Sequence, residues 1–133
     1  MKVVSQNVWR QVMVPPGSYY LGDPCYSVPR GDWGELLSSC DCFQASPVGK
    51  VRGFEVLAFG TAHGDGVYED QRGNVYGVDS GLIGLVPVEL CDGESLYDEP
   101  EKVVTFASET LCETDGDGRL SFGSYFIDTK RGD

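Results

Sequence analysis

The segment Phe54-Glu55-Val56-Leu57-Ala58-Phe59 decides the predicted fold, because it is an almost continuous apolar run with a glycine on either side. A short run of this kind predicts a buried β-strand. Further along, Val67-Tyr68 and Val75-Tyr76 flank Arg72-Gly73-Asn74, a pattern that predicts a β-hairpin. Residues 82–90 are nearly all apolar, so we expect a central strand that becomes an edge or a bulge near its proline. The middle of the chain therefore predicts the core of a β-sheet.

Strands are also predicted on both sides of this core. They cover residues 8–14, 18–21 and 25–28 before it and residues 103–106 and 120–127 after it, the last two as a closing hairpin. One short helix is predicted from Asp32 to about Cys40, because Asp32 is a favourable N-cap residue and Glu35 follows three positions later. About seven or eight short strands with one helix indicate a mainly β antiparallel domain, either a small barrel or a sandwich-like fold. Residues 1–133 suffice for one such domain and are too few for two.

The net charge of −11 is concentrated in one part of the sequence. Residues 89–117 contain ten acidic residues against Lys102 alone, a net charge of −9, and we expect an acidic loop over residues 94–101. An acidic surface repels phosphate backbones and anionic lipids, which disfavours direct binding to nucleic acid or to a membrane. A protein partner is therefore favoured, although an acidic face that only maintains solubility explains the same charges.

The sequence shows no targeting or cofactor motif. Its first ten residues lack a continuous apolar segment, and no apolar run approaches the ~20 residues of a membrane span, so we expect a cytoplasmic protein. Five cysteines, an odd number without a secretory signal, indicate reduced thiols. Neither a pair of zinc-binding motifs nor a phosphate-binding glycine loop is present, so no cofactor is expected.

The glycine- and aspartate-rich segment from Phe59 to Tyr68 is the best candidate for a site, and it contains the only histidine. One hypothesis is a catalytic pair of Cys25 and His63, oriented by Asp65 or Asp79. A thiol nucleophile needs a neighbouring base, and the base needs a group that fixes its orientation. A buried, unreactive cysteine and a loop histidine explain the same residues, and we therefore favour a protein that is not an enzyme.

Two groups of acidic residues resemble parts of metal sites. Asp115 and Asp117, with a glycine after each, imitate the start of a calcium loop, but Ser124 stands where such a loop needs a bidentate acid. A glycine-rich hairpin turn explains this segment without a metal. The second group comprises Asp65, Glu69, Asp70 and Asp79. Oxygen ligands suit a divalent ion, but these residues also belong to ordinary turn sequences.

Tyrosine and tryptophan are numerous in this chain, so some of their rings are expected at the surface. Exposed rings beside an acidic segment suit a protein interface. With the acidic region and the central loops, this reasoning gives the residues expected to bind a partner or ligand: Asp23, Tyr26, His63, Asp65, Tyr68, Asp79, Ser80, Asp98, Glu99 and Glu101.

Three segments are distinctive when they are taken together. They are Tyr20-Leu21-Gly22-Asp23-Pro24-Cys25-Tyr26, Phe59-Gly60-Thr61-Ala62-His63-Gly64-Asp65-Gly66-Val67-Tyr68 and Val78-Asp79-Ser80-Gly81-Leu82-Ile83-Gly84. This combination resembles an uncharacterised family of small phage and bacterial proteins. The resemblance spans residues 18–90, leaves out the acidic residues 92–117 and implies no particular reaction. It favours an accessory role in which a phage protein acts on a host protein.

We therefore expect a non-enzymatic acidic binding protein, and more specifically a phage accessory protein that binds a host protein. One alternative is a domain that binds a small ligand or a metal, or a hydrolase, through the central glycine- and aspartate-rich loops. Another alternative is a minor component of a virion.

Overall fold

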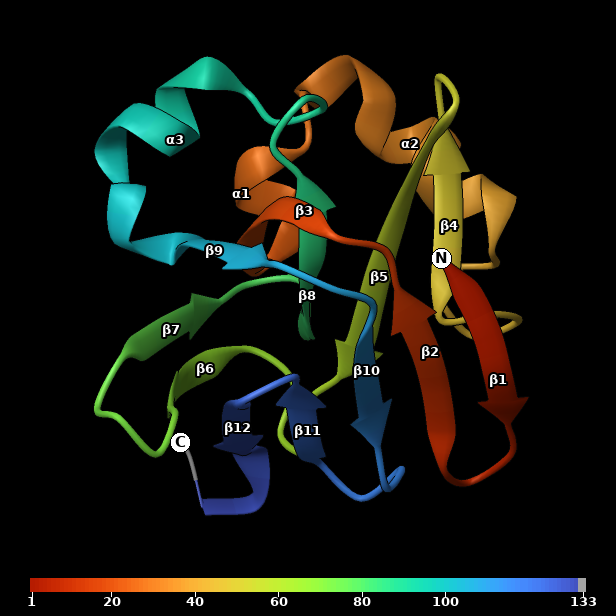
Figure 1. Ribbon diagram of the computed structural model, residues 1–133, viewed down its shortest axis with the longest axis vertical. Helices are drawn as coiled ribbons and strands as arrows, with labels where there is room; N and C mark the ends of the chain where they lie inside the picture. Colours follow the sequence, from red (N-terminus) through yellow and green to blue (C-terminus); the bar gives the residue numbers. More distant parts are fainter. Residues whose placement is uncertain (132–133) are drawn as a thin grey trace.

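The computed structural model describes residues 1–131 and shows two five-stranded antiparallel sheets with helices at one end (Figure 1). The strands are β1 (Lys2–Gln6), β2 (Arg10–Val14), β3 (Gly17–Gly22), β4 (Val48–Val51), β5 (Phe54–Gly60), β6 (Gly66–Glu69), β7 (Val75–Val78), β8 (Leu82–Pro87), β9 (Val103–Phe106), β10 (Thr110–Thr114), β11 (Arg119–Phe122) and β12 (Tyr125–Asp128). The helices are α1 (Pro24–Ser27), α2 (Arg30–Ser39) and α3 (Gly93–Asp98), with the short 3-10 helices η1 (Pro100–Lys102) and η2 (Thr129–Arg131).

The first sheet has the strand order β1-β2-β10-β11-β12 and the second has the order β4-β5-β8-β3-β9. Strands β6 and β7 form a separate hairpin, which meets β12 through a bridge between Asp70 and Ile127. Within residues 1–131 no sheet closes into a barrel, so the predicted mainly β, antiparallel fold is confirmed in its sandwich-like form. None of the helices described there has the length and apolar character needed to span a membrane.

Two hydrophobic clusters hold this arrangement together. The larger lies between the two sheets and the β6–β7 hairpin, and its members include Val12, Leu57, Tyr68, Ile83 and Leu120. The smaller lies between the other face of the second sheet and the helices α1 and α2, and its members include Tyr20, Leu36, Val56, Val86 and Leu90. Because the second sheet is covered on both faces, its central strands need the nearly continuous apolar runs that the sequence contains.

The predicted centre of the fold is confirmed. The run from Phe54 to Phe59 forms β5, and the segments around Tyr68 and Tyr76 form the antiparallel β6–β7 hairpin. Strand β8 lies between β5 and β3 at its start, but Val86 and Pro87 pair only with β3, so the strand becomes an edge near its proline as predicted. It ends at Pro87, short of the predicted residue 90. A turn follows, in which the amide of Leu90 donates to the carbonyl oxygen of Pro87.

Predictions for residues 25–40 were wrong in detail. The predicted strand over residues 25–28 is helix α1, because Asp23 caps the amide of Cys25 and Pro24 occupies the first helical position. The predicted helix exists as α2 but begins at Arg30. Asp32 is therefore inside its first turn, where it binds the guanidinium of Arg52 instead of capping the helix.

The ends of the chain contain more elements than the sequence predicted. Strand β1 precedes the predicted first strand, and residues 8–9 belong to the turn after it. The predicted acidic loop over residues 94–101 contains most of α3 and most of η1. The prediction of a closing hairpin between residues 103–106 and 120–127 was wrong, because β9 pairs with β3. Residues 119–128 instead form a hairpin of their own, in which β11 and β12 are joined by a turn at Gly123 with a φ of +65°. Strand β10 was not predicted at all.

Candidate functional site

The buried carboxylate of Asp23 joins the start of α1 to the turn between β7 and β8. Its Oδ2 accepts hydrogen bonds from the amides of Asp79 and Ser80, at 2.7 and 2.8 Å. Its Oδ1 accepts from the Ser80 hydroxyl at 2.6 Å and from the Cys25 amide at 2.9 Å. Asp23 is only 1% exposed, so these four donors replace the water that its charge would otherwise need.

The central glycine-rich segment meets the same turn. The amide of Thr61 donates to the carbonyl oxygen of Gly81 at 3.0 Å. The hydroxyl of Tyr68 donates to the carbonyl oxygen of Gly64 at 2.9 Å, which holds the segment over the β6–β7 hairpin. The three distinctive sequence segments therefore meet in one cluster, which we call the motif loops and define as residues 23–26, 61–64 and 79–81. Asp23, Asp79, Ser80 and Tyr68 all contribute to its hydrogen bonds.

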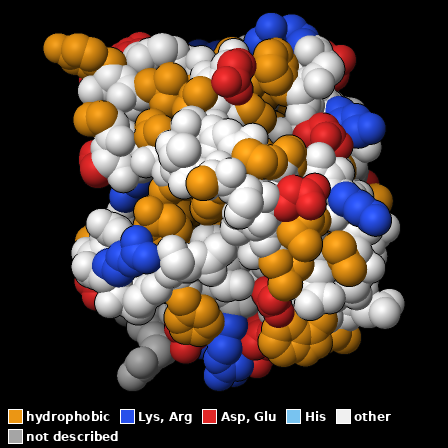
Figure 2. Space-filling model, in the orientation of Figure 1, with side chains coloured by type: hydrophobic (Ala, Val, Ile, Leu, Met, Phe, Trp, Pro, Cys, Tyr) orange, Lys and Arg blue, Asp and Glu red, His pale blue; other side chains and the backbone are white. Residues whose placement is uncertain are grey.

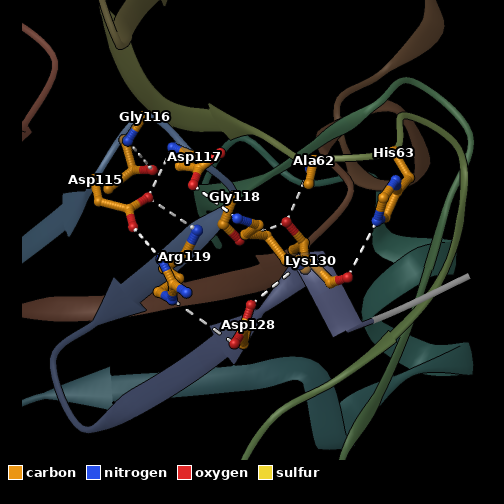
Figure 3. Close-up of polar contacts among 11 residues, drawn as sticks. Ala62, His63, Asp115, Gly116, Asp117, Gly118, Arg119, Asp128 and Lys130 are labelled. Carbon is orange, nitrogen blue, oxygen red and sulfur yellow. Dashed lines mark hydrogen bonds and ion pairs between the residues drawn. The ribbon is translucent and has the colours of Figure 1, made fainter.

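The structure does not bring Cys25 and His63 together as a catalytic pair. His63 is exposed, and its Nε2 lies 3.1 Å from the carbonyl oxygen of Lys130 (Figure 3). Asp65 is exposed too, and among the described residues no hydrogen bond joins it or His63 to Cys25. Burial, followed by the hydrogen bond and the charge of Asp23, raises the pKa of the Cys25 thiol to about 12. Cys25 is thus a neutral thiol near pH 7, whereas a nucleophilic cysteine must be a thiolate.

The segment that resembles a calcium loop is the turn between β10 and β11, which confirms the hairpin interpretation. The carboxylate of Asp115 accepts from the amides of Asp117 and Arg119 and from the Arg119 guanidinium, and Asp117 binds the ammonium of Lys130 at 2.9 Å (Figure 3). Burial alone would raise the pKa of Asp115, but these hydrogen bonds outweigh burial and hold that pKa below its ordinary value. Its oxygens are therefore occupied in stabilising the turn.

The second acidic group, Asp65, Glu69, Asp70 and Asp79, does not come together around one point in the described residues. Asp70 is buried and accepts from the amides of Arg72 and Asn74, the Asn74 side chain and the Tyr76 hydroxyl, so it organises the loop between β6 and β7. Burial would raise its pKa, but the hydrogen bonds of its neighbours, led by that from the Asn74 side chain, lower it overall. Over residues 1–131, no three His, Cys, Asp or Glu side chains are grouped so as to hold a metal ion.

A groove of about 400 Å³ lies between α1 and α3. It is lined by Tyr26, Asp92, Glu94, Ser95, Asp98 and Glu99, and we call it the acidic groove. Three of the residues predicted to bind a partner, Tyr26, Asp98 and Glu99, thus come together, while Glu101 is exposed in η1 outside the lining. Asp92 caps α3 by accepting from the Glu94 amide at 2.9 Å.

The four carboxylates of the acidic groove have no basic counterpart. The described residues that line the groove include neither Lys nor Arg, and no ion pair of residues 1–131 involves these carboxylates. Of these four carboxylates, only that of Glu99 accepts a hydrogen bond from another described side chain, the Tyr20 hydroxyl at 3.0 Å. Carboxylates this close repel one another, so a cation that enters the groove gains attraction from several of them.

Tyr26 links the acidic groove to the motif loops. Tyr26 is 40% exposed, and its partial burial, followed by the hydrogen bond and charge of Asp79, raises the pKa of its hydroxyl. Since α1 begins at the Asp23 cap, the hydrogen bonds of the motif loops fix the place from which Tyr26 projects. The motif loops therefore support one side of the groove.

Sequence reasoning missed Asp92, Glu94 and Ser95 as site residues. The signal was present, because Asp92 is a favourable N-cap residue and an acidic residue follows it in the first turn of α3. Because the sequence predicts a loop over residues 94–101, it does not indicate that the acidic side chains of α3 share a groove with Tyr26.

The chain was compared with models of protein families, with curated proteins and with solved structures, and it matches none of them. The geometry and charge of the acidic groove are therefore the main indication of what this protein binds.

Proposed function

We propose that the protein is a non-enzymatic binding protein that holds a Lys- or Arg-rich segment of a partner protein in the acidic groove. The observation that carries this proposal is the set of four carboxylates around one 400 Å³ hollow, with no basic residue in its described lining. A cationic side chain is the occupant with the complementary charge. Arginine suits the groove in a second way, because its planar guanidinium stacks on an aromatic ring such as Tyr26 while donating to carboxylates.

The surroundings of the acidic groove favour a protein partner over a free cation. Tyr97 on α3 is 86% exposed, and exposed tyrosines are common anchors of protein interfaces. Residues 89–117 carry a net charge of −9, which would attract a basic partner over the range of a Debye length. On the face in Figure 2, hydrophobic side chains are scattered among charged ones and do not gather in one area. The charge of the acidic region is therefore the basis of the proposed recognition.

We place this binding in the cytoplasm and take the partner to be a host protein, following the resemblance of the motif loops to small phage and bacterial proteins. Purification of the partner with the tagged protein, compared with the presence of the protein in purified particles, separates this role from that of a minor virion component.

The proposal is tested by fluorescence anisotropy with a labelled Arg-rich peptide. The double variant Glu94→Gln/Asp98→Asn removes two charges from the acidic groove, and Glu69→Gln/Glu109→Gln removes two exposed charges elsewhere. We expect the groove variant to weaken binding about tenfold, because charged hydrogen bonds contribute more than a diffuse surface charge. Binding should also weaken as salt rises from about 50 to about 200 mM. Equal losses in the two variants would contradict the proposal, since net charge alone would then explain the affinity.

A further inference from the structure

A second hollow, of about 370 Å³, lies at the hairpin end of the molecule. Residues from β2, from the end of β5 and from the β10–β11 turn line it, among them Arg10, Phe59, Gly60, Thr114, Asp117 and Gly118. Figure 1 shows the turns β1–β2 and β10–β11 at the lower end of the molecule, away from α3 and its acidic groove. We call this hollow the hairpin-end pocket.

Hydrogen bonds between distant segments fix the walls of the hairpin-end pocket. The hydroxyl of the fully buried Thr129 accepts from the amide of Ala62 at 2.9 Å, and the Thr129 amide donates to the carbonyl oxygen of Gly118 at 2.8 Å. Gly118 has a φ of +91°, and a Cβ placed there would lie 2.5 Å from the Cβ of Ala62. The two walls can approach this closely only because a glycine occupies position 118.

The hairpin-end pocket presents one cationic and one anionic side chain. Arg10 is held in place because its Nη1 donates to the carbonyl oxygen of Phe43 and its Nη2 donates to that of Gln44. A guanidinium has five N–H groups, so these two bonds use only part of its donors, and Arg10 also lines the hairpin-end pocket. Asp117 binds Lys130 through Oδ2, and no hydrogen bond of residues 1–131 uses its Oδ1. Phe59, which is 1% exposed, adds an apolar surface at the base.

We propose that the hairpin-end pocket binds a free α-amino acid. The ligand carboxylate accepts hydrogen bonds from Arg10, its ammonium donates to Asp117, and an apolar side chain packs towards Phe59. A zwitterion matches both charges and has no net charge, so the −11 charge of the protein does not oppose its entry. A phosphate or other dianion would meet the carboxylate of Asp117, and a simple amine would offer the Arg10 guanidinium no anionic partner.

The hairpin-end pocket also has the size and composition expected for a small ligand. Its volume falls in the range of about 300–1,000 Å³ that is usual for such sites, and it combines an apolar base with a few polar groups. This inference is independent of the proposed protein partner, because the hairpin-end pocket shares no lining residue with the acidic groove.

The test is an NMR titration of the full-length ¹⁵N-labelled protein with each of the common amino acids at millimolar concentration. We expect saturable shifts of the amides of Gly60, Gly116 and Gly118 with at least one apolar amino acid. Its N-acetyl derivative and its carboxamide should each bind at least about tenfold more weakly, because each lacks one of the two charges. The proposal is overturned if no amino acid shifts these amides, or if either derivative binds as well as the parent.

Two variants with matched controls locate the site. A Cβ at Gly60 or at Gly77 meets no atom within 4 Å, so a valine fits at either position. Gly60 lines the hairpin-end pocket, and Gly60→Val should obstruct it. Gly77→Val, on β7 and outside the pocket lining, is the matched control. Asp117→Asn removes the ammonium partner, and Glu109→Gln neutralises an exposed loop carboxylate outside the pocket lining. We expect each pocket variant to weaken binding at least about tenfold and each control to preserve it. Unchanged binding in both pocket variants would overturn the assignment, and intact spectra of the free proteins show that the variants fold.

Discussion

At the hairpin end of the molecule, Asp115 is paired with Arg119 and Asp117 with Lys130, whereas the acidic groove at the helical end has four carboxylates and no basic residue in its described lining. Both regions are rich in acidic residues in the sequence. Their side chains nevertheless have different surroundings, because at the hairpin end Arg119 binds Asp115 across the turn and Lys130 of η2 binds Asp117. Acidic residues thus form ion pairs with basic neighbours in one region, whereas in the other region no basic residue lines the groove beside them.

This difference also separates the two candidate sites by the kind of ligand each suits. The acidic groove has charge of one sign, so it suits a cationic segment and should be sensitive to salt. The hairpin-end pocket has one charge of each sign, so it suits a small neutral zwitterion. Substitutions at the two ends should therefore have distinguishable consequences.

The largest expected effect concerns whether the helical end is a chemical site or a binding site. With its pKa raised to about 12, Cys25 should react with iodoacetamide at about pH 8 at least about a hundredfold more slowly than the exposed Cys42. Mass spectrometry of peptides from the alkylated protein measures both rates. The difference should vanish in denaturant, and similar rates in the native protein would favour a reactive thiol beside the acidic groove.

The next effect concerns the support that the motif loops give to the acidic groove. Asp23→Ala should lower the free energy of unfolding by about 3 kcal/mol, because it leaves several donors of the β7–β8 turn and of α1 without an acceptor. Urea unfolding measures this loss. Asp65→Ala, at an exposed carboxylate, should change the same quantity by less than about 0.5 kcal/mol. A loss below about 1 kcal/mol for Asp23→Ala would show that the loops do not depend on this carboxylate.

A smaller effect compares one carboxylate from each end. Asp115→Ala should cost about 1–2 kcal/mol of stability, because two amides and Arg119 lose their acceptor, yet it should leave the affinity for the Arg-rich peptide unchanged. Asp98→Ala should show the reverse, with weaker peptide binding and a stability change under about 0.5 kcal/mol. Parallel effects of the two substitutions would remove the distinction between the two ends.

The smallest effect is a dependence on pH at the hairpin end. Because the pKa of Asp115 is lower in the folded protein than its ordinary value of 3.8, its ionised form stabilises the fold fully above that value. This contribution is lost as the pH falls through the folded-state pKa. The stability advantage of the native protein over Asp115→Asn should therefore shrink below about pH 4, as measured by urea unfolding at several pH values. An advantage that stays constant between about pH 5 and pH 2.5 would contradict this assignment.

The sequence predicted the centre of the fold because its hydrophobic pattern is unambiguous there. The buried strands β5 and β8 are apolar runs between turn residues, and the β6–β7 hairpin has alternating valine and tyrosine. At the ends, the run from Leu120 to Ile127 looks continuous, but Gly123 divides it into two strands. A glycine in such a run indicates either a bulge or a turn, and only the pairing partner decides between them.

The sequence also predicted part of the candidate site. Tyr26, Asp98 and Glu99 were expected to bind because of residue type and charge, but their proximity depends on α1 and α3, which had been interpreted as a strand and a loop. The pairing of Asp115 with Arg119 could have been anticipated from the turn between them. That of Asp117 with Lys130 depends on how β12 and η2 return to the turn, which the sequence does not reveal.

The most direct test of the central claim is an NMR titration of the ¹⁵N-labelled protein with the Arg-rich peptide at low salt. Binding in the acidic groove predicts that the saturable amide shifts are concentrated at Tyr26 and at residues 92–99, and that they disappear in Glu94→Gln/Asp98→Asn. Shifts spread evenly over exposed acidic residues such as Glu69 and Glu109 would contradict a built site and leave only attraction between net charges.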